Sequence, residues 1–355
     1  MSARLTVSIA LCTFEGERFL KPQLESFAAQ TRLPDELVVC DDGSSDATLA
    51  ILEAWAETVP FEVRILRNER NLGYAQNFGK TISLCSKDVI FLSDQDDVWE
   101  PEKIEKMTAV FEAEPDVGLV VSDGFIIDES GKRQPGSMQE LVRPWFFDET
   151  NGFCECVPRP EDAYPQGCAS AFRASLKPVL LPIPALWSHD IWLQAVSHAV
   201  SRGRVLPEFL FSYRLYSANT SGFGSFEDRI RLWERKKRIY VWNMPQQFWA
   251  WVPRIGQFRE RMEALPESEK KTRILRQLQR NVRHYENRNR IQRSLLIYGF
   301  LWGLELLRGG YAEHLFPIRS AFFDLRTGFW SALNPVRTFR EVKLLWGKFF
   351  PQKSE

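Results

Sequence analysis

Three aspartates follow an apolar run in the segment DVIFLSDQDDVW, residues 88–99. Residues 89–92 have the composition of a buried strand, and Asp94, Asp96 and Asp97 come directly after it. Carboxylates this close repel one another and resist burial. A divalent ion such as Mg²⁺ or Mn²⁺ removes this penalty, because it binds one or two carboxylates together with phosphate oxygens. Alternatively, the three residues form a turn that leads into a helix beginning near Pro101.

A second acidic pair lies in CDDGSSDAT, residues 40–48. A turn at Gly43 and a helix cap at Ser45 or Asp46 account for much of this segment. One cap residue suffices, however, and this leaves Asp41 and Asp42 unexplained at the end of a second apolar run. Carboxylates in such a place can accept hydrogen bonds from a nucleotide base or from ribose hydroxyls.

The segment NLGYAQNF, residues 71–78, has the pattern of a loop that enters a helix. Gly73 would let the backbone approach a ligand closely. No Gly-Lys-Ser/Thr follows, and the chain contains no GxGxxG sequence. These absences argue against an ATP-hydrolysing P-loop protein and against a dinucleotide-binding protein.

The segment SHD, residues 188–190, opens a helical pattern over residues 187–201. One interpretation is helix capping, with Asp190 in a favourable position for the helix dipole. The other is general-base catalysis by Asp190, whose pKa the neighbouring Trp187 and Trp192 would raise by lowering local polarity. The residues alone leave both open. The remaining histidines have no ligand-like spacing, and we expect them to be structural or on the surface: His198, His284 and His314.

Strand and helix patterns alternate through the first 125 residues. The apolar runs predict strands at residues 5–11, 36–40, 61–66, 88–92 and 117–122. Helical spacing predicts helices at residues 17–30, 47–56, 71–85 and 101–111. This alternation indicates right-handed βαβ units around a mostly parallel sheet, an α/β fold whose ligands bind at the carboxyl ends of the strands. Thr13, Asp41, Asp42 and residues 94–97 are therefore expected on one rim. Residues 131–165 indicate a long loop or paired short strands, and residues 213–222 indicate a loop.

The charge of the chain is zero overall but unevenly distributed. Residues 226–293 contain 18 Lys or Arg against 8 Asp or Glu, and residues 226–355 contain 7 of the 12 Trp. We therefore expect a catalytic domain at residues 1–225 and a basic, Trp-rich helical domain at residues 226–355. Such helices can lie on an anionic membrane, or they can pack on the catalytic domain or on another subunit. No nucleic-acid-binding module is recognised, so nucleic acid is not an expected partner.

The cysteines and the first residues bear on the compartment. None of the six cysteines has metal-site spacing, and buried free thiols are typical of a reducing compartment. Residues 5–11 indicate a first strand rather than a signal peptide. The longest apolar stretch, residues 295–307, is shorter than the roughly 20 residues of a membrane-spanning helix and contains Glu305. We expect no transmembrane helix.

Taken together, these segments resemble a known family. FEGERFL (14–20), DDGSSD (41–46), residues 71–78 and SDQDDVW (93–99) occur in the order found in the inverting family 2 glycosyltransferases of the GT-A fold. SDQDDVW, QGCASAF (166–172) and SHDIW (188–192) resemble in particular the bacterial rhamnosyltransferase-like branch, which builds surface polysaccharides. The resemblance covers about residues 5–222 and rests on the combined order of the motifs.

The resemblance implies a role for each motif. It implies that Asp190 is the catalytic base, and that Asp94 and Asp96 form the metal and diphosphate site, with Asp96 as the direct ligand of Mg²⁺ or Mn²⁺. Asp97 is expected only to prepare the following helix. The nucleotide-binding residues would be Thr13, Glu15, Asp41, Asp42, Asn77 and Asp94. The donor or acceptor pocket would include Gln95, Trp99, Gly167, Cys168, His189, Trp192, Arg214 and Tyr216.

The sequence departs from the family at one position. Many relatives have Tyr-Arg-Gln-His after the base helix, and that His can complete the metal or diphosphate site. This chain has Tyr213-Arg214-Leu215-Tyr216. Tyr216 could hydrogen-bond a phosphate, but a neutral phenol is a poor ligand for Mg²⁺, so the third protein contact of the metal is open.

The resemblance also implies an activity. We expect a metal-dependent hexosyltransferase that moves a sugar, with dTDP-L-rhamnose as the leading donor, to a hydroxyl of a surface polysaccharide such as O-antigen or of a lipid-linked oligosaccharide. The alternatives are a UDP- or GDP-sugar donor, or a catalytically silent scaffold that binds glycan or lipid. The expected location is cytoplasmic, at the inner face of a bacterial membrane as a peripheral protein, and a homo-oligomer is compatible with this.

Overall fold

The computed structural model describes residues 4–140, 167–216, 248–293 and 295–307. The chain divides into two compact units: the described residues up to Tyr216 belong to the first, and those from Phe248 onward belong to the second. The boundary expected at residues 225 and 226 lies outside the described residues. Each unit is considered separately below.

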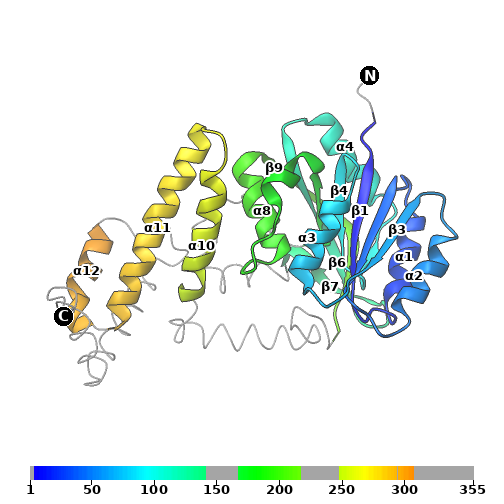
Figure 1. The fold of residues 1–355 in the computed structure, drawn as a ribbon, viewed down its shortest axis with the longest axis horizontal. Helices are drawn as coiled ribbons and strands as arrows, with labels where there is room; N and C mark the ends of the chain where they lie inside the picture. Colours follow the sequence, from blue (N-terminus) through cyan, green and yellow to red (C-terminus); the bar gives the residue numbers. More distant parts are fainter. Residues whose placement is uncertain (1–3, 141–166, 217–247, 294, 308–355) are drawn as a thin grey trace. The chain divides into compact units, whose positions relative to one another are not determined.

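The described strands of the first unit form one nine-stranded sheet in the order β3-β2-β1-β4-β8-β6-β9-β5, with β7 paired to β6 (Figure 1). Their bounds are β1 (Val7–Thr13), β2 (Glu36–Asp41), β3 (Glu62–Arg67), β4 (Val89–Ser93), β5 (Val98–Trp99), β6 (Val117–Ile127), β7 (Arg133–Ser137), β8 (Ser170–Arg173) and β9 (Arg202–Arg214).

The sheet has a parallel half and a mixed half. Strands β3, β2, β1 and β4 are all parallel, as the alternation of strand and helix patterns predicts. Strand β8 then runs antiparallel to both β4 and β6, while β9 is parallel to β6 and β5 is antiparallel to β9. The parallel half is built entirely from residues before Ser93, and β8 joins it to the mixed half.

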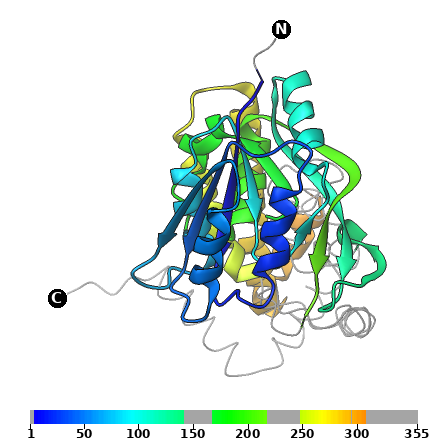
Figure 2. The same cartoon turned by 90° about the vertical axis from the view of Figure 1, so that its right-hand side faces the viewer.

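Helices cover both faces of the sheet. Figure 1 shows α3 and α8 on one side of the sheet and α1 and α2 on the other, and Figure 2, turned by 90°, brings the side with α1 and α2 toward the viewer. Helix α4 packs on β6 and β9. The helices of this unit are α1 (Leu20–Ala28), α2 (Thr48–Ala56), α3 (Tyr74–Leu84), α4 (Lys103–Ala113), the 3₁₀ turn η1 (Ala174–Leu176), α7 (Lys177–Leu180) and α8 (His189–Val200).

The core follows from the apolar runs. Every residue of β2 and β4, and all but one of β1, is buried, because helices cover both faces of these parallel strands. Helix α1 turns one face inward, since Leu20, Leu24 and Phe27 recur at helical spacing and are all buried. The most regular sequence patterns therefore fix the parallel half, whose strand ends carry the polar motifs.

The mixed half differs from the expected elements. Strand β9 extends through Arg214, where the sequence indicated a loop, and β6 continues to Ile127 rather than ending near residue 122. The residues of β9 before Leu210 are partly exposed and include Arg202, Arg204 and Glu208, so no apolar run marks them as a strand. Long-range pairing with β6 holds β9 extended.

The second unit is helical in its described part, as expected for this region. It contains α10 (Phe248–Glu263), α11 (Glu269–Arg293) and α12 (Leu295–Leu307). Helices α10 and α11 pack through Ile255, Phe258, Ile274 and Leu278, which are all buried. No helix within the described ranges is both long and apolar enough to cross a bilayer.

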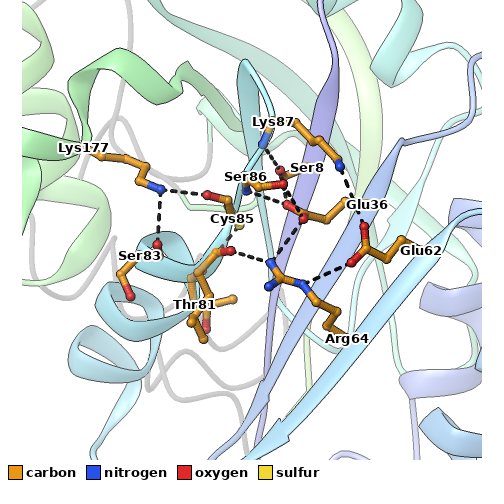
Figure 3. A network of polar contacts seen from close by, with 11 residues as sticks. Ser8, Glu36, Glu62, Arg64, Thr81, Ser83, Cys85, Ser86, Lys87 and Lys177 are labelled. Atoms are coloured by element: carbon orange, nitrogen blue, oxygen red, sulfur yellow. Dashed lines mark hydrogen bonds and ion pairs between the residues drawn. The ribbon is translucent and has the colours of Figure 1, made fainter.

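A buried carboxylate ties together the strands at the amino-terminal edge of the parallel half (Figure 3). Glu36 Oε1 accepts hydrogen bonds from Ser8 Oγ at 2.6 Å and from the Ser86 amide at 2.7 Å. Oε2 accepts from Ser86 Oγ at 2.8 Å and from Arg64 Nη2 at 3.1 Å. Burial alone would raise the pKa of Glu36, but these hydrogen bonds and the charge of Arg64 outweigh it, so the pKa is lowered.

Replacing Glu36 with Gln is expected to lower the free energy of unfolding by about 2 kcal/mol near pH 7, because the charge-assisted hydrogen bonds are weakened. The contribution of Glu36 is fully present above its unfolded pKa of about 4.3 and is lost as the pH falls through its lower folded-state pKa. Urea unfolding of wild type and Glu36→Gln at several pH values measures both effects.

The matched control is Glu62→Gln. Glu62 belongs to the same network but is 52% exposed, with Arg64 Nε at 3.7 Å. Its replacement is expected to change the free energy of unfolding by no more than about 0.5 kcal/mol. Equal effects of the two substitutions would contradict a special role for the buried carboxylate.

Candidate active site

The polar strand ends meet on one rim of the sheet. Thr13 lies beside Asp41 in the register of β1 and β2, and Leu11 lies beside Ser93 in the register of β1 and β4. The residues after β1, β2 and β4 therefore leave the sheet at the same edge. The clustering expected from the strand order is present.

Asp41 organises this rim from within. Oδ1 accepts hydrogen bonds from the amides of Gly43 and Ser44 at 3.1 and 2.8 Å, and Oδ2 accepts from the hydroxyls of Thr13 and Ser44 at 2.9 and 2.5 Å. Asp41 is fully buried. The geometry thus gives Asp41 and Thr13 the task of shaping the turn, so that a nucleotide would touch the turn rather than their side chains.

Asp42 holds the entrance to α3. Its carboxylate accepts hydrogen bonds from Asn68 Nδ2 at 2.7 Å and from the amides of Leu72 and Gly73 at 2.8 and 2.9 Å. Asn77 lies behind it, accepting from Asn68 at 2.9 Å and donating to the carbonyl oxygen of Cys40 at 2.8 Å. Gly73 has a φ of +79°, which favours glycine. Asp42 and Asn77 are thereby fixed by main-chain and amide contacts.

A cavity of about 460 Å³ opens beside Asp42. It is lined by Phe14, Asp42, Gly43, Arg67, Asn68, Glu69, Arg70 and Asn71. An aromatic ring, two guanidinium groups and a fixed carboxylate suit a ligand with a flat polar ring and negative charge. Asn68, Arg67 and Arg70 were not singled out in the sequence, although Asn68 directly follows β3 as Asp42 follows β2.

Two loops at the rim are linked by Glu15 and Gln95. Glu15 Oε1 accepts hydrogen bonds from the amide and hydroxyl of Ser45 at 2.8 and 2.9 Å, and Glu15 has an uncommon φ of +50°. Gln95 accepts a hydrogen bond from the Phe14 amide at 2.8 Å and donates to the Phe14 carbonyl oxygen at 3.0 Å. A Cβ at Gly16 would lie 2.3 Å from Gln95 Oε1, so any larger residue there would displace the Gln95 side chain. The loops after β1 and β4 are therefore rigidly joined.

The three aspartates after β4 form a crowded group. Burial raises the pKa of Asp94, and the charges of Asp97, Asp96 and Asp190 raise it further. Burial also raises the pKa of Asp96, against the lowering effect of a hydrogen bond from Tyr216. Burial and the charge of Asp96 raise the pKa of Asp97 to about 7. Burial and mutual repulsion therefore favour the protonated forms of these carboxylates, and a bound cation would favour their ionised forms instead.

Lys103 lies beneath this group as a fully buried cation. Its Nζ donates a hydrogen bond to the Cys168 carbonyl oxygen at 2.5 Å and lies 4.6 and 4.5 Å from the ring centres of Trp99 and Phe211. Burial lowers the pKa of Lys103 to about 8, against the opposing effect of Asp97 and Asp94. No sequence pattern pointed to Lys103, because PEKIEK has the pattern of a solvated helix start.

Asp190 lies in the first turn of α8, and its charge raises the pKa of Asp94. The two carboxylates are thus within electrostatic range, although 96 positions separate them in the sequence. Asp190 Oδ1 accepts a hydrogen bond from the Ile191 amide at 2.7 Å. The N-cap residue is Ser188, and within the described residues this helix has no side-chain cap hydrogen bond. Asp190 in the first turn is in a favourable position for the helix dipole, and the position is also compatible with base catalysis.

His189 and Gly167 are packed against each other. The imidazole stacks on Phe78 with ring centres 3.8 Å apart, and a Cβ at Gly167 would lie 2.4 Å from His189 Nε2. Burial lowers the pKa of His189, which keeps the ring neutral.

Two tryptophans expected in the pocket are core residues. Trp192 is fully buried and donates a hydrogen bond to the Leu180 carbonyl oxygen at 2.7 Å. Trp99 is buried against Phe27, with ring centres 4.7 Å apart. Both support the site from below, and any contact with a ligand would require them to leave this packing.

The residues at the end of β9 reach the acidic group. Arg214 Nε donates a hydrogen bond to the Asp96 carbonyl oxygen at 2.9 Å, and Tyr216 Oη donates to Asp96 Oδ2 at 2.7 Å. Burial and the charge of Asp96 raise the pKa of Tyr216, so the phenol remains protonated. The structure thus pairs Tyr216 with a carboxylate, where the sequence suggested a phosphate as its partner.

The donor set fits a hard divalent ion. Ligand atoms of Asp94, Asp97 and Cys168 lie within 4.8 Å of one another, and Asp97 Oδ2 is buried without a hydrogen bond from any described residue. Burial and the charges of Asp97 and Asp94 raise the pKa of the Cys168 thiol, so the sulfur stays protonated. A protonated thiol is a poor ligand for Mg²⁺. The carboxylates are the suitable donors. Of the two residues expected as ligands, Asp94 belongs to this cluster and Asp96 lies outside it, while Asp97 was not expected.

A comparison with known protein families finds a match in the first unit. Residues 8–176 match the family model of Glycosyl transferase family 2. Over these residues, which are just under half of the chain, the first unit is similar to the family 2 glycosyltransferases. The match spans β1 to β8 and includes the rim loops after β1, β2 and β4, whereas Asp190 and Tyr216 lie beyond it.

Two curated relatives that are similar to this chain are named as glycosyltransferases. An uncharacterized glycosyltransferase of Nostoc sp. is 24% identical over 61% of this chain and 66% of its own length. The amylovoran biosynthesis glycosyltransferase AmsE of Erwinia amylovora is 33% identical over 36% of this chain and 48% of its own length. The chain thus spans less than two thirds of either relative.

The crystal structure of S. aureus TarS 1-349 has the same fold. It superposes with a TM-score of 0.52 and 16% identity, covering 91% of this chain and 92% of that chain. The first unit therefore has the GT-A fold expected from the sequence motifs, and a helical region follows it in the chain.

The pH dependence of the free energy of unfolding tests whether burial and neighbouring charge raise the pKa of Asp97. The folded chain keeps the Asp97 proton up to about pH 7, whereas the unfolded chain loses it near pH 3.9. The free energy of unfolding of wild type should therefore fall as the pH rises between these values, and this decline should be reduced in Asp97→Asn. Urea unfolding in the presence of a chelator measures both curves.

The matched control is Asp88→Asn, which should act in the opposite direction. Hydrogen bonds from the Thr6 amide and hydroxyl lower the pKa of Asp88. Its contribution to stability is present above the unfolded pKa and is lost on acidification. If Asp97→Asn lost stability near neutral pH as Asp88→Asn should, the crowding of charges would be refuted.

Proposed function

We propose that this chain is an inverting, metal-dependent glycosyltransferase. It would move a sugar from a nucleotide diphosphate to a hydroxyl of a surface polysaccharide or a lipid-linked glycan. The observation that supports this proposal is that the charges of Asp96 and Asp190 both act on Asp94, at the sheet edge where β1, β2 and β4 end. A candidate base and a candidate diphosphate site would then be neighbours on the edge that also carries the cavity at Asp42.

The nucleotide would bind in the cavity beside Asp42. Phe14 offers a ring for stacking against the base, and the amides of the turn at Gly43 and Ser44 are fixed by Asp41. Arg67 and Arg70 bring positive charge to the same cavity. Thr13, Glu15, Asp41 and Asn77 act mainly by holding these loops in place, according to their hydrogen bonds.

Asp94 and Asp96 would hold a Mg²⁺ or Mn²⁺ ion, which supplies positive charge to the diphosphate as it leaves. Asp190 accepts the proton of the acceptor hydroxyl while the hydroxyl oxygen bonds to the anomeric carbon. The bond from that carbon to the diphosphate oxygen breaks in the same step. The oxygen enters opposite the leaving group, so the configuration inverts, and no covalent nucleophile is needed.

We propose dTDP-L-rhamnose as the first donor to test, with UDP- and GDP-linked sugars as alternatives. The sequence motifs around Asp96, Cys168 and Asp190 support the rhamnosyltransferase-like branch. The relative AmsE is named for amylovoran biosynthesis, which supports a polysaccharide product. A screen of nucleotide sugars for hydrolysis and transfer, with and without Mn²⁺, distinguishes the donors.

Asp190→Asn is expected to lower kcat by about 10²- to 10⁴-fold, because the amide cannot accept the proton. Binding of the donor nucleotide, measured by calorimetry, should change little because Asp190 acts on the acceptor. Asp116→Asn serves as a control, since Asp116 pairs with Arg202 on the surface. Near-normal transfer by a folded Asp190→Asn protein would contradict the proposed role.

The helical region from residue 226 onward is proposed to contact an anionic membrane. Helix α11 carries nine Lys or Arg against two Glu, and on α12 the side chains of Phe300 and Leu307 are 66% and 87% exposed. Basic charge beside exposed apolar side chains is typical of helices at a membrane interface. This location would bring the enzyme to a lipid-linked acceptor at the inner face of the membrane.

Replacing Phe300 and Leu307 with Ser should reduce flotation of the full chain with anionic vesicles several-fold, because apolar contact with the lipid is lost. Val200→Ser, which alters an exposed apolar residue of the first unit, should not change flotation. Unchanged flotation of the Phe300 and Leu307 variant would exclude this surface as the point of contact.

A further inference from the structure

Two residues at the end of β9, Arg214 and Tyr216, form hydrogen bonds with the acidic segment at Asp96 and Asp97. Tyr216 Oη donates a hydrogen bond to Asp96 Oδ2 at 2.7 Å, and its ring packs on Phe19 with ring centres 4.8 Å apart. The Arg214 guanidinium lies 4.7 Å from the centre of the same Phe19 ring. One aromatic ring from the loop before α1 therefore supports both side chains.

Arg214 fixes the main chain of this segment. Nε donates to the Asp96 carbonyl oxygen at 2.9 Å, and the Arg214 amide donates to Asp97 Oδ1 at 3.2 Å. Nη1 donates to the carbonyl oxygens of Asp128 and Glu129, both at 3.2 Å. Because the backbone at Asp96 is held in this way, only the Asp96 side chain can still rotate. The hydrogen bond from the Tyr216 phenol restricts this rotation.

We propose that Tyr216 is a positioning residue that orients the Asp96 carboxylate for the divalent ion. This inference rests on the proposed function. The phenol engages Oδ2 and so fixes the orientation of the Asp96 carboxylate. Hydrogen-bond partners of metal-binding carboxylates commonly govern metal affinity in this manner, because they fix the orientation of the ligand.

The geometry separates this role from direct ligation. The phenol hydrogen points to a carboxylate oxygen, so Tyr216 acts as a donor toward the site. Direct ligation would require Tyr216 to give up its bond to Asp96 and to present its oxygen to the ion. The two roles predict different responses when Asp96 itself is altered.

Tyr216→Phe in the full chain tests the role, because it removes a single oxygen and keeps the ring on Phe19. Binding of Mn²⁺ alone, followed by electron paramagnetic resonance of the free ion, should weaken by about 10- to 100-fold. Tyr213→Phe, on the same strand, should bind Mn²⁺ within about twofold of wild type. Thermal melting checks that each variant is folded.

A double-mutant cycle decides how Tyr216 acts. If it acts through Asp96, adding Tyr216→Phe to Asp96→Asn should weaken Mn²⁺ binding no further. Additive losses would indicate that Tyr216 binds the ion itself and would overturn the inference. Unchanged Mn²⁺ affinity in Tyr216→Phe, or no Mn²⁺ binding by wild type, would overturn it as well. The donor screen and Asp190→Asn test sugar transfer separately, so failure here is distinguishable from failure of the proposed function.

Discussion

Repulsion among carboxylates at the end of β4 is the constraint around which the site is organised. Asp94, Asp96 and Asp97 lie close enough to raise one another's pKa, and burial deepens the penalty. The fold offsets part of it with Lys103 below the group and with donors from Arg214 and Tyr216. A fold that keeps buried, mutually repelling carboxylates despite their cost in stability is typical of a binding site for a positively charged ligand.

The surrounding loops are arranged around these buried, mutually repelling aspartates. Gln95 joins the crowded loop to the loop after β1, and Asp41 and Asp42 stiffen the loops after β2 and β3. Each of these side chains forms at least one hydrogen bond with a main-chain amide of a neighbouring loop. The rim is therefore preorganised, so that a ligand need not order the loops when it binds.

The sequence predicted the parallel half and the rim better than the mixed half. Apolar runs and helical spacing located β1 to β4 and their helices, and the strand-end rule placed Asp41, Asp42 and Asp94 together. It could not predict β9, whose extended shape depends on pairing with β6 across 84 to 87 positions of the chain. Lys103 was missed for a related reason, because its burial arises from Trp99 and Phe211, and only the folded chain brings Phe211 there.

The antiparallel strand β8 has a consequence for how such a domain can diversify. It lies between β4 and β6, so the cavity beside Asp42 belongs to the parallel half, whereas the helix α8, which bears Asp190, packs on β6 and β9 as well as on α3. Substitutions in β6 and β9 can reshape the surroundings of Asp190 while the loops around Asp42 keep their internal hydrogen bonds. Under the proposed function, one half that binds the nucleotide can in this way be combined with many acceptors.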